Sequence, residues 1–159
     1  MNRRPLYLLL LTSGCLAGPA DGSSQFGAVG VYRGTWAVKG TVTPAGTQEV
    51  GCAGRISITA QFGPQLQPNL LVNETVPNCA AAVAEILSGS FAADGAVTLS
   101  GSANARFTFD QLNCVTTVTR FDLQGQLESE LLSLRHVGTL SCEGDARSVD
   151  LELRFTGSR

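Results

Sequence analysis

Side chains that commonly perform chemistry are sparse in this chain, which contains a single histidine, His136. Any histidine-based triad or multi-histidine metal site would have to include it. In the segment LSLRHVGTL, however, His136 shares an alternating face with Leu134 and Leu140. This pattern favours a histidine held in a core or lining the inside of a barrel.

Nucleophiles and paired carboxylates give no stronger signal. None of the serines lies in a GxSxG nucleophile elbow. The acidic residues have no spacing that marks a catalytic pair, and most fit solvated strand faces or turns: Asp110, Asp122, Glu128, Glu130, Asp145 and Asp150. We therefore expect no catalytic residue, no enzymatic activity and no cofactor.

Four of the cysteines are widely spaced along the chain: Cys52, Cys79, Cys114 and Cys142. An even number of cysteines in an exported chain predicts two disulfides, for which three pairings are possible. We favour Cys52 with Cys79 and Cys114 with Cys142, because each pair closes a short loop between near neighbours. A zinc site is the alternative, but without a CxxC pair we expect no metal.

The elements that would position these side chains are strands. In CAGRISITAQF, residues 52–62, the even positions are mostly apolar and the odd positions mostly polar. The segment SVDLELRF, residues 148–155, alternates in the same way. This period of two indicates strands with one buried face.

Weaker alternation extends over most of the chain between these two strands and before the first. It predicts strands within residues 30–43, on both sides of a turn near Asp94 and Gly95, and at 106–109, 114–123, 126–131 and 132–142. The segment CAAAVAEIL, Cys79 to Leu87, is the exception, because alanine and glutamate favour a short helix or helical turn. The same segment would also fit a strand face.

About eight strands without long helices predict an all-β antiparallel meander. Such a sheet closes into a small barrel or folds into a sandwich, so that its edges are covered, and we favour the barrel. The side chains that could line a ligand cavity inside it are Tyr32, Trp36, Phe62, Phe91 and His136.

The first residues have the composition of an export signal. Arg3 and Arg4 precede the apolar run Leu6 to Leu11, which is too short to span a membrane. The run ends in LTSGC, which resembles the lipobox of bacterial lipoproteins. That resemblance implies cleavage before Cys15 and a diacylglycerol attached to it. Ordinary secretion, with cleavage after Ala17, is the alternative.

This reading divides the chain into a signal peptide (1–14), a flexible tether (15–28) and one β domain (29–159). Loss of Arg3 and Arg4 changes the formal net charge from −2 to −4, and Lys39 is the only lysine. A chain without a basic cluster lacks the footprint of a nucleic-acid binder. The lipobox resemblance implies a cell-envelope protein held in the membrane by its lipid, with the outer membrane favoured because Leu16, and not aspartate, follows Cys15.

A second resemblance concerns the domain itself. The tripeptide GTW, Gly34 to Trp36, is similar to the Gly-x-Trp opening of lipocalins and related up-and-down barrels. In that family a late arginine packs over the tryptophan, which makes Arg154 the nearest candidate. Alternation, however, points Arg154 away from the face of Leu153 and Phe155.

Two functions follow from these observations. The first is a barrel on the cell envelope that binds a small apolar ligand. The second is a structural or protein-interaction module with a filled core and no ligand. A large apolar cavity would favour the first, and a solidly packed core would favour the second. The sequence identifies no protein partner.

Overall fold

The computed structural model describes residues 27–72, 82–84 and 87–159. These residues form strands and one 3-10 helix (η1, Asp110–Leu112). The strands are β1 (Gly30–Val42), β2 (Gly46–Phe62), β3 (Gln65–Val72), β4 (Ala82–Ala84), β5 (Leu87–Phe91), β6 (Ala96–Phe109), β7 (Cys114–Glu128), β8 (Leu131–Ser141) and β9 (Ser148–Ser158). Within the described part of the chain, no helix is long and apolar enough to cross a membrane.

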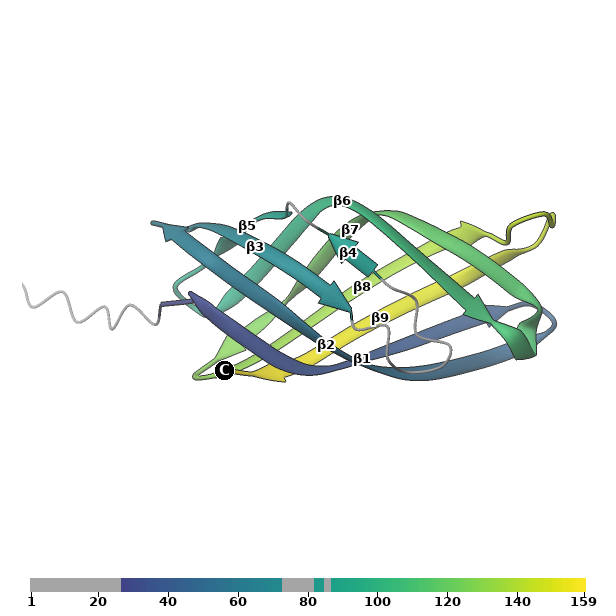
Figure 1. The fold of residues 1–159 in the computed structure, drawn as a ribbon, viewed down its shortest axis with the longest axis horizontal. Coiled ribbons are helices and arrows are strands. Elements are labelled where there is room, and N and C mark those ends of the chain that lie inside the picture. The colour runs from purple at the N-terminus through teal and green to yellow at the C-terminus, as the bar shows by residue number, and fades with distance from the viewer. Residues whose placement is uncertain (1–26, 73–81, 85–86) are drawn as a thin grey trace, which may run out of the picture.

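The strands form a single antiparallel meander that closes on itself (Figure 1). Apart from β4 with β5, strands that are neighbours in sequence pair with each other, and β1 also pairs with the last strand, β9. The short strands β4 and β5 both lie between β3 and β6, so they share one position of the ring. The predicted eight-stranded meander and its closure as a barrel are therefore confirmed.

Alternation along each strand separates the inside of the barrel from the outside. In β2, Ile56 and Ile58 are buried while Arg55 is exposed, and β9 buries Leu151, Leu153 and Phe155 in the same way. The bulkiest of the side chains with almost no exposed surface are Trp36, Tyr32, Phe109, Phe121 and Phe155. Because inward side chains come from strands all around the ring, the core is the interior of the barrel.

The strand boundaries differ from the predicted ones along β6 and β7. The predicted strands 114–123 and 126–131 are one strand, β7, and the turn falls later, at Ser129, whose φ is +56°. Gly125 lies within β7 and does not form a turn. A Cβ at this position would lie 1.8 Å from the carbonyl oxygen of Ser133 on β8, so the close approach of the two strands requires glycine. Likewise, the residues before Arg106 continue into one long strand, β6, through a bulge between Ser102 and Ala105.

The helix predicted for Cys79 to Leu87 is wrong at the described residues of that segment. Ala82–Ala84 form strand β4, which pairs with both β3 and β6, and Leu87 begins β5. Residues 79–81 and 85–86 lie outside the described residues. A strand between β3 and β6 pairs with both of them, and this tertiary interaction outweighs alanine's preference for a helix.

One of the two predicted disulfides is present. Cys114 and Cys142 are bonded with an S–S distance of 2.02 Å, which joins the start of β7 to the end of β8. Cys52 is also in a disulfide. Its predicted partner Cys79 lies outside the described residues, as does Cys15, so the pairing of Cys52 with Cys79 stays a prediction.

Candidate functional site

Four of the five predicted lining residues lie inside the barrel. Tyr32, Trp36 and His136 are buried, and Phe91 is half-buried against the core. They come from three strands, β1, β5 and β8, and are part of the packed interior.

The prediction for Phe62 is wrong, because this side chain is 67% exposed. The register between β2 and β3 shifts between Ile58 and Ala60, so that Thr59 is an extra residue in β2. A bulge of this kind reverses the alternation beyond it. Gln61 is consequently half-buried, where its Oε1 accepts a hydrogen bond from the Ala28 amide at 2.9 Å.

Trp36 packs against Phe155 of β9, with ring centroids 5.0 Å apart. Arg154 points outward and pairs with Glu152, so no arginine at that position covers the tryptophan. Gly34 of the GTW tripeptide allows β9 to approach closely, because a Cβ there would lie 2.0 Å from the carbonyl oxygen of Thr156. The indole Nε1 of Trp36 is buried and has no hydrogen-bond partner among the described residues.

Tyr32 is held at the end of the barrel where β1 begins and β9 ends. Its hydroxyl donates a hydrogen bond to the carbonyl oxygen of Ala28 at 2.9 Å. The guanidinium of Arg159 lies 5.9 Å from the centre of the ring and donates hydrogen bonds to the carbonyl oxygens of Gly27 and Val29. Burial raises the pKa of the Tyr32 phenol, and the positive charge of Arg159 offsets part of that rise.

The wall of the barrel is incomplete between β7 and β8. Only five residue pairs join these strands, from Gln124 with Arg135 to Glu128 with Leu131. Beyond them, residues 114–123 of β7 pair only with β6, and residues 136–141 of β8 pair only with β9. We call these two stretches the β7–β8 seam.

His136 bridges the β7–β8 seam at the point where the ladder stops. Its Nδ1 lies 3.3 Å from the amide nitrogen and 3.1 Å from the carbonyl oxygen of Asp122. Either ring tautomer therefore makes one hydrogen bond to the β7 backbone. The imidazole also meets the Phe121 ring edge-on at 5.8 Å. His136 is thus a buried histidine with its ring nitrogen hydrogen-bonded, as its alternation with leucines predicted, and it connects β8 to β7 where the ladder has ended.

At the other end of the seam the strands are joined again. The Glu143 amide donates to the carbonyl oxygen of Val115 at 2.6 Å, and the Thr116 hydroxyl donates to the carbonyl oxygen of Ser141 at 2.9 Å. The Cys114–Cys142 disulfide lies beside these two bonds. The seam is therefore fastened at both ends without a continuous ladder.

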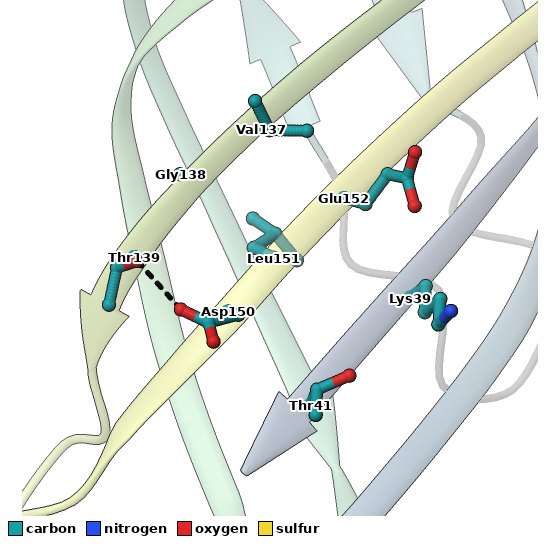
Figure 2. Close-up of a pocket in the computed structure, with 8 residues that line it drawn as sticks. All are labelled: Lys39, Thr41, Val137, Gly138, Thr139, Asp150, Leu151 and Glu152. Carbon is teal, nitrogen blue, oxygen red and sulfur yellow. Dashed lines mark hydrogen bonds between the residues drawn. The ribbon is translucent and has the colours of Figure 1, made fainter.

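The outer wall carries a shallow groove of about 380 Å³ across β1, β9 and β8 (Figure 2). It is lined by Lys39, Thr41, Val137, Gly138, Thr139, Asp150, Leu151 and Glu152. Thr139 donates a hydrogen bond to a carboxylate oxygen of Asp150 at 2.6 Å. Glu152 accepts hydrogen bonds from Arg135 and Arg154, which lower the pKa of its carboxyl group.

Chemically, this groove offers charges and hydroxyl groups but no activated nucleophile. Lys39 lies beside Glu152 in the register of β1 with β9, and it makes no hydrogen bond or ion pair to the described residues. Val137 is 57% exposed among the polar side chains. A second groove, of about 350 Å³, crosses β3, β5, β6 and β7 and is lined mainly by serine, threonine and glutamine.

These outer surfaces were not identified from the sequence. Alternating polar positions in a strand indicate a solvated face. The sequence of one strand does not show which polar residues of the neighbouring strands lie beside them. Cross-strand register supplies that information, since it places Lys39 next to both Glu49 and Glu152. In the described part of the chain, no three histidine, cysteine or acidic side chains are grouped to hold a metal ion.

No family model and no curated protein sequence matches the chain. Among solved structures, it is similar to a crystal structure described as a "putative outer membrane protein" from Bacteroides fragilis. The TM-score is 0.45 at 14% sequence identity, and the alignment covers 83% of this chain and 51% of that chain. This chain thus spans about half the length of that protein, and so distant a likeness carries no conclusion about function.

Proposed function

We propose that this protein is a lipid-anchored component of the bacterial cell envelope whose barrel is a structural or protein-interaction module. The leader supports the first part, because LTSGC places Cys15 where a lipobox cysteine would be. The same resemblance favours the outer membrane. Neither His136 nor the carboxylates of the outer groove have a geometry that supports catalysis, so we propose no enzymatic role.

The packed interior carries the second part of this proposal. Trp36, Tyr32, Phe109, Phe121 and Phe155 extend into the barrel, and each has at most 1% of its surface exposed. An eight-stranded barrel is just wide enough to be filled by its own side chains. Both grooves described above lie on the outer wall, where a partner protein has direct access.

Mass spectrometry of the protein purified from its own cells tests the anchor. The expected mature chain begins at Cys15 and carries the mass of a diacylglycerol. A chain that begins at Gly18 without added mass would indicate ordinary secretion and would contradict lipid anchoring. Mass spectrometry of a digest of the same unreduced protein shows whether Cys52 pairs with Cys79.

The filled core is tested by the emission of Trp36, the only tryptophan in the chain. If the interior is packed, titration with long-chain fatty acids or an apolar fluorescent dye should leave both the intensity and the wavelength of this emission unchanged. A saturable change with one binding site per chain would contradict the module and favour a carrier.

One observation favours the carrier as a second candidate. The buried Nε1–H group of Trp36 has no acceptor in the described part of the chain, and unpaired buried donors are rare because each costs free energy. A small apolar ligand with one acceptor oxygen would satisfy it, which also agrees with the lipocalin-like GTW tripeptide. In that case Trp36→Phe should weaken binding, while Phe91→Leu, which leaves the donor in place, should weaken it less.

A further inference from the structure

Four of the five large hydrophobic side chains that are exposed among the described residues lie at the same end of the barrel. They are Val29, Val31, Phe62 and Leu131, with 46%, 43%, 67% and 45% of their surfaces exposed. They belong to the beginning of β1, the end of β2 and the beginning of β8. These strand ends lie together with the end of β9 at the left of Figure 1.

Two exposed arginines lie on strands that carry these apolar side chains. Arg33 of β1 is directly opposite Arg55 of β2, and both are exposed. Neither makes an ion pair or side-chain hydrogen bond to the described residues, whereas Arg106, Arg120, Arg135, Arg147 and Arg154 each have a carboxylate partner. Like charges directly opposite each other destabilise a sheet, so nothing in the described fold accounts for this pair.

The register places the two arginines and Leu131 in one row on the outer surface, and Phe62 lies seven residues after Arg55 at the end of β2. Arg55, Arg33, Ser158 and Leu131 follow one another across four adjacent strands, and all four are exposed. Val31 lies two residues before Arg33 on the same outward face. We name the set Val29, Val31, Arg33, Arg55, Phe62 and Leu131 the end patch. The acidic residues Glu128, at the end of β7, and Glu130, in the β7–β8 turn, lie at the same end of the barrel.

We infer that the end patch rests on a lipid bilayer, with Val31, Phe62 and Leu131 among the acyl chains and the two arginines on anionic headgroups. Apolar side chains beside unpaired cations are the combination that binds a membrane interface. The rest of the chain gives a formal excess of acidic groups, which an anionic surface repels, so the attraction is confined to this end.

The position of the chain's beginning fits this orientation. Gly27, the first described residue, lies at the end of the barrel that carries the end patch, and Cys15 precedes it by 12 residues. The tether that the sequence predicts between them would reach about 20 Å. This part of the inference rests on the proposed lipid anchor, which would hold the end patch against the membrane. The affinity of the patch for lipid can be measured without the anchor.

The experiment uses the mature chain, residues 15–159, with Cys15→Ser so that no lipid is attached. This chain contains every described strand. It is mixed with vesicles of phosphatidylcholine alone or with an equal amount of phosphatidylglycerol, and the bound fraction is measured by sedimentation. We expect binding to the anionic vesicles that weakens with salt. Arg33→Gln and Arg55→Gln should each reduce the affinity about fivefold.

Matched variants show which part of the surface is responsible. Arg106→Gln removes the same charge nearer the opposite end of the barrel and should leave the affinity almost unchanged, whereas Phe62→Ser should reduce binding. Thermal unfolding of each variant confirms that it is folded. The inference is overturned if the chain does not bind anionic vesicles, or if Arg106→Gln weakens binding as much as Arg33→Gln.

The two proposals fail separately. Anionic vesicle binding by the unlipidated chain supports the end patch even if mass spectrometry finds no lipid on Cys15. A lipid on Cys15 together with no vesicle binding would retain the anchor and overturn the end patch.

Discussion

Two parts of the barrel wall hold neighbouring strands together in different ways. β1 and β2 pair without interruption from Gly30 with Ile58 to Val42 with Gly46. β7 and β8 are of similar length, yet they pair only from Gln124 to Glu128. The first wall is a continuous hydrogen-bonded ladder, whereas the second depends on separate fastenings at its two ends.

The difference shows that a closed sheet does not need every ladder to be complete. At the β7–β8 seam, the ring nitrogen of His136 takes the place of a backbone partner, and the Cys114–Cys142 disulfide holds the other end. We therefore expect changes in the β1 wall to affect the whole barrel. Changes at the seam should open that region first.

The largest effect is expected from Trp36→Ala in the β1 wall. It removes the largest buried side chain and its contact with Phe155, and large-to-small changes of this kind cost about 3 to 5 kcal/mol of unfolding free energy. Denaturant unfolding measures the loss, with the exposed neighbour Thr35→Ala as the control. A cost below about 1 kcal/mol would mean that the barrel is not packed around Trp36.

Removal of the disulfide by Cys114→Ala with Cys142→Ala comes next. The bond spans 28 residues, and the loop-entropy model gives a loss of about 3 to 4 kcal/mol. Hydrogen exchange should accelerate first at residues 115–122 and 136–141, while the β1–β2 ladder keeps its protection. Uniform acceleration of hydrogen exchange over the whole barrel would contradict the prediction that the seam opens before the rest of the wall.

A smaller effect is expected from His136→Leu, which keeps the buried volume but removes the ring nitrogen. The Asp122 backbone then loses its hydrogen bond to the imidazole, at a cost of about 1 to 2 kcal/mol. His136→Asn, which retains a donor and an acceptor, should recover part of this loss. If the two variants are equally stable in denaturant, His136 fills space and does not fasten the seam.

The smallest effect is a shift in the titration of Tyr32, the only tyrosine after residue 14. Its pKa in the folded protein lies above the ordinary value of 10.0. Stability from this group is therefore complete below pH 10.0 and is lost as the pH rises through the folded pKa. Arg159→Gln should raise the pKa further, because the guanidinium favours the phenolate. The ultraviolet absorbance of tyrosinate in the mature chain measures the pKa of Tyr32 in the original protein and in the variant. A lower pKa in Arg159→Gln would contradict the contact between Arg159 and the Tyr32 ring.

Most of the fold could be predicted from alternation, because burial on one face leaves a period of two in the sequence. Ile56 and Ile58 in β2, and Leu151, Leu153 and Phe155 in β9, lie inside the barrel as predicted. The pairing of Cys114 with Cys142 was also predicted correctly, since neighbouring strands of a meander bring such cysteines together.

What could not be predicted depends on contacts between strands. Gly125 has the sequence signature of a turn, but it is a glycine because the backbone of β8 passes too close for a side chain. Phe62 follows the alternation of β2 until the bulge at Thr59, which no local pattern reveals. Arg33 and Arg55 are distant in sequence, and only the register shows that these two like charges face each other.

The pairing of the first strand with the last determines the order in which the barrel is assembled. The partners joined between β1 and β9 are 109 to 125 residues apart, so one edge of β1 has no strand to pair with until the final residues have been made. Such an edge can recruit strands from other chains. Lys39 lies near the middle of this edge, and a lysine there discourages such recruitment in the nascent protein. The chain's single lysine thus acts before the native structure exists. We expect Lys39→Val to lower the yield of soluble protein without lowering the stability of the finished barrel.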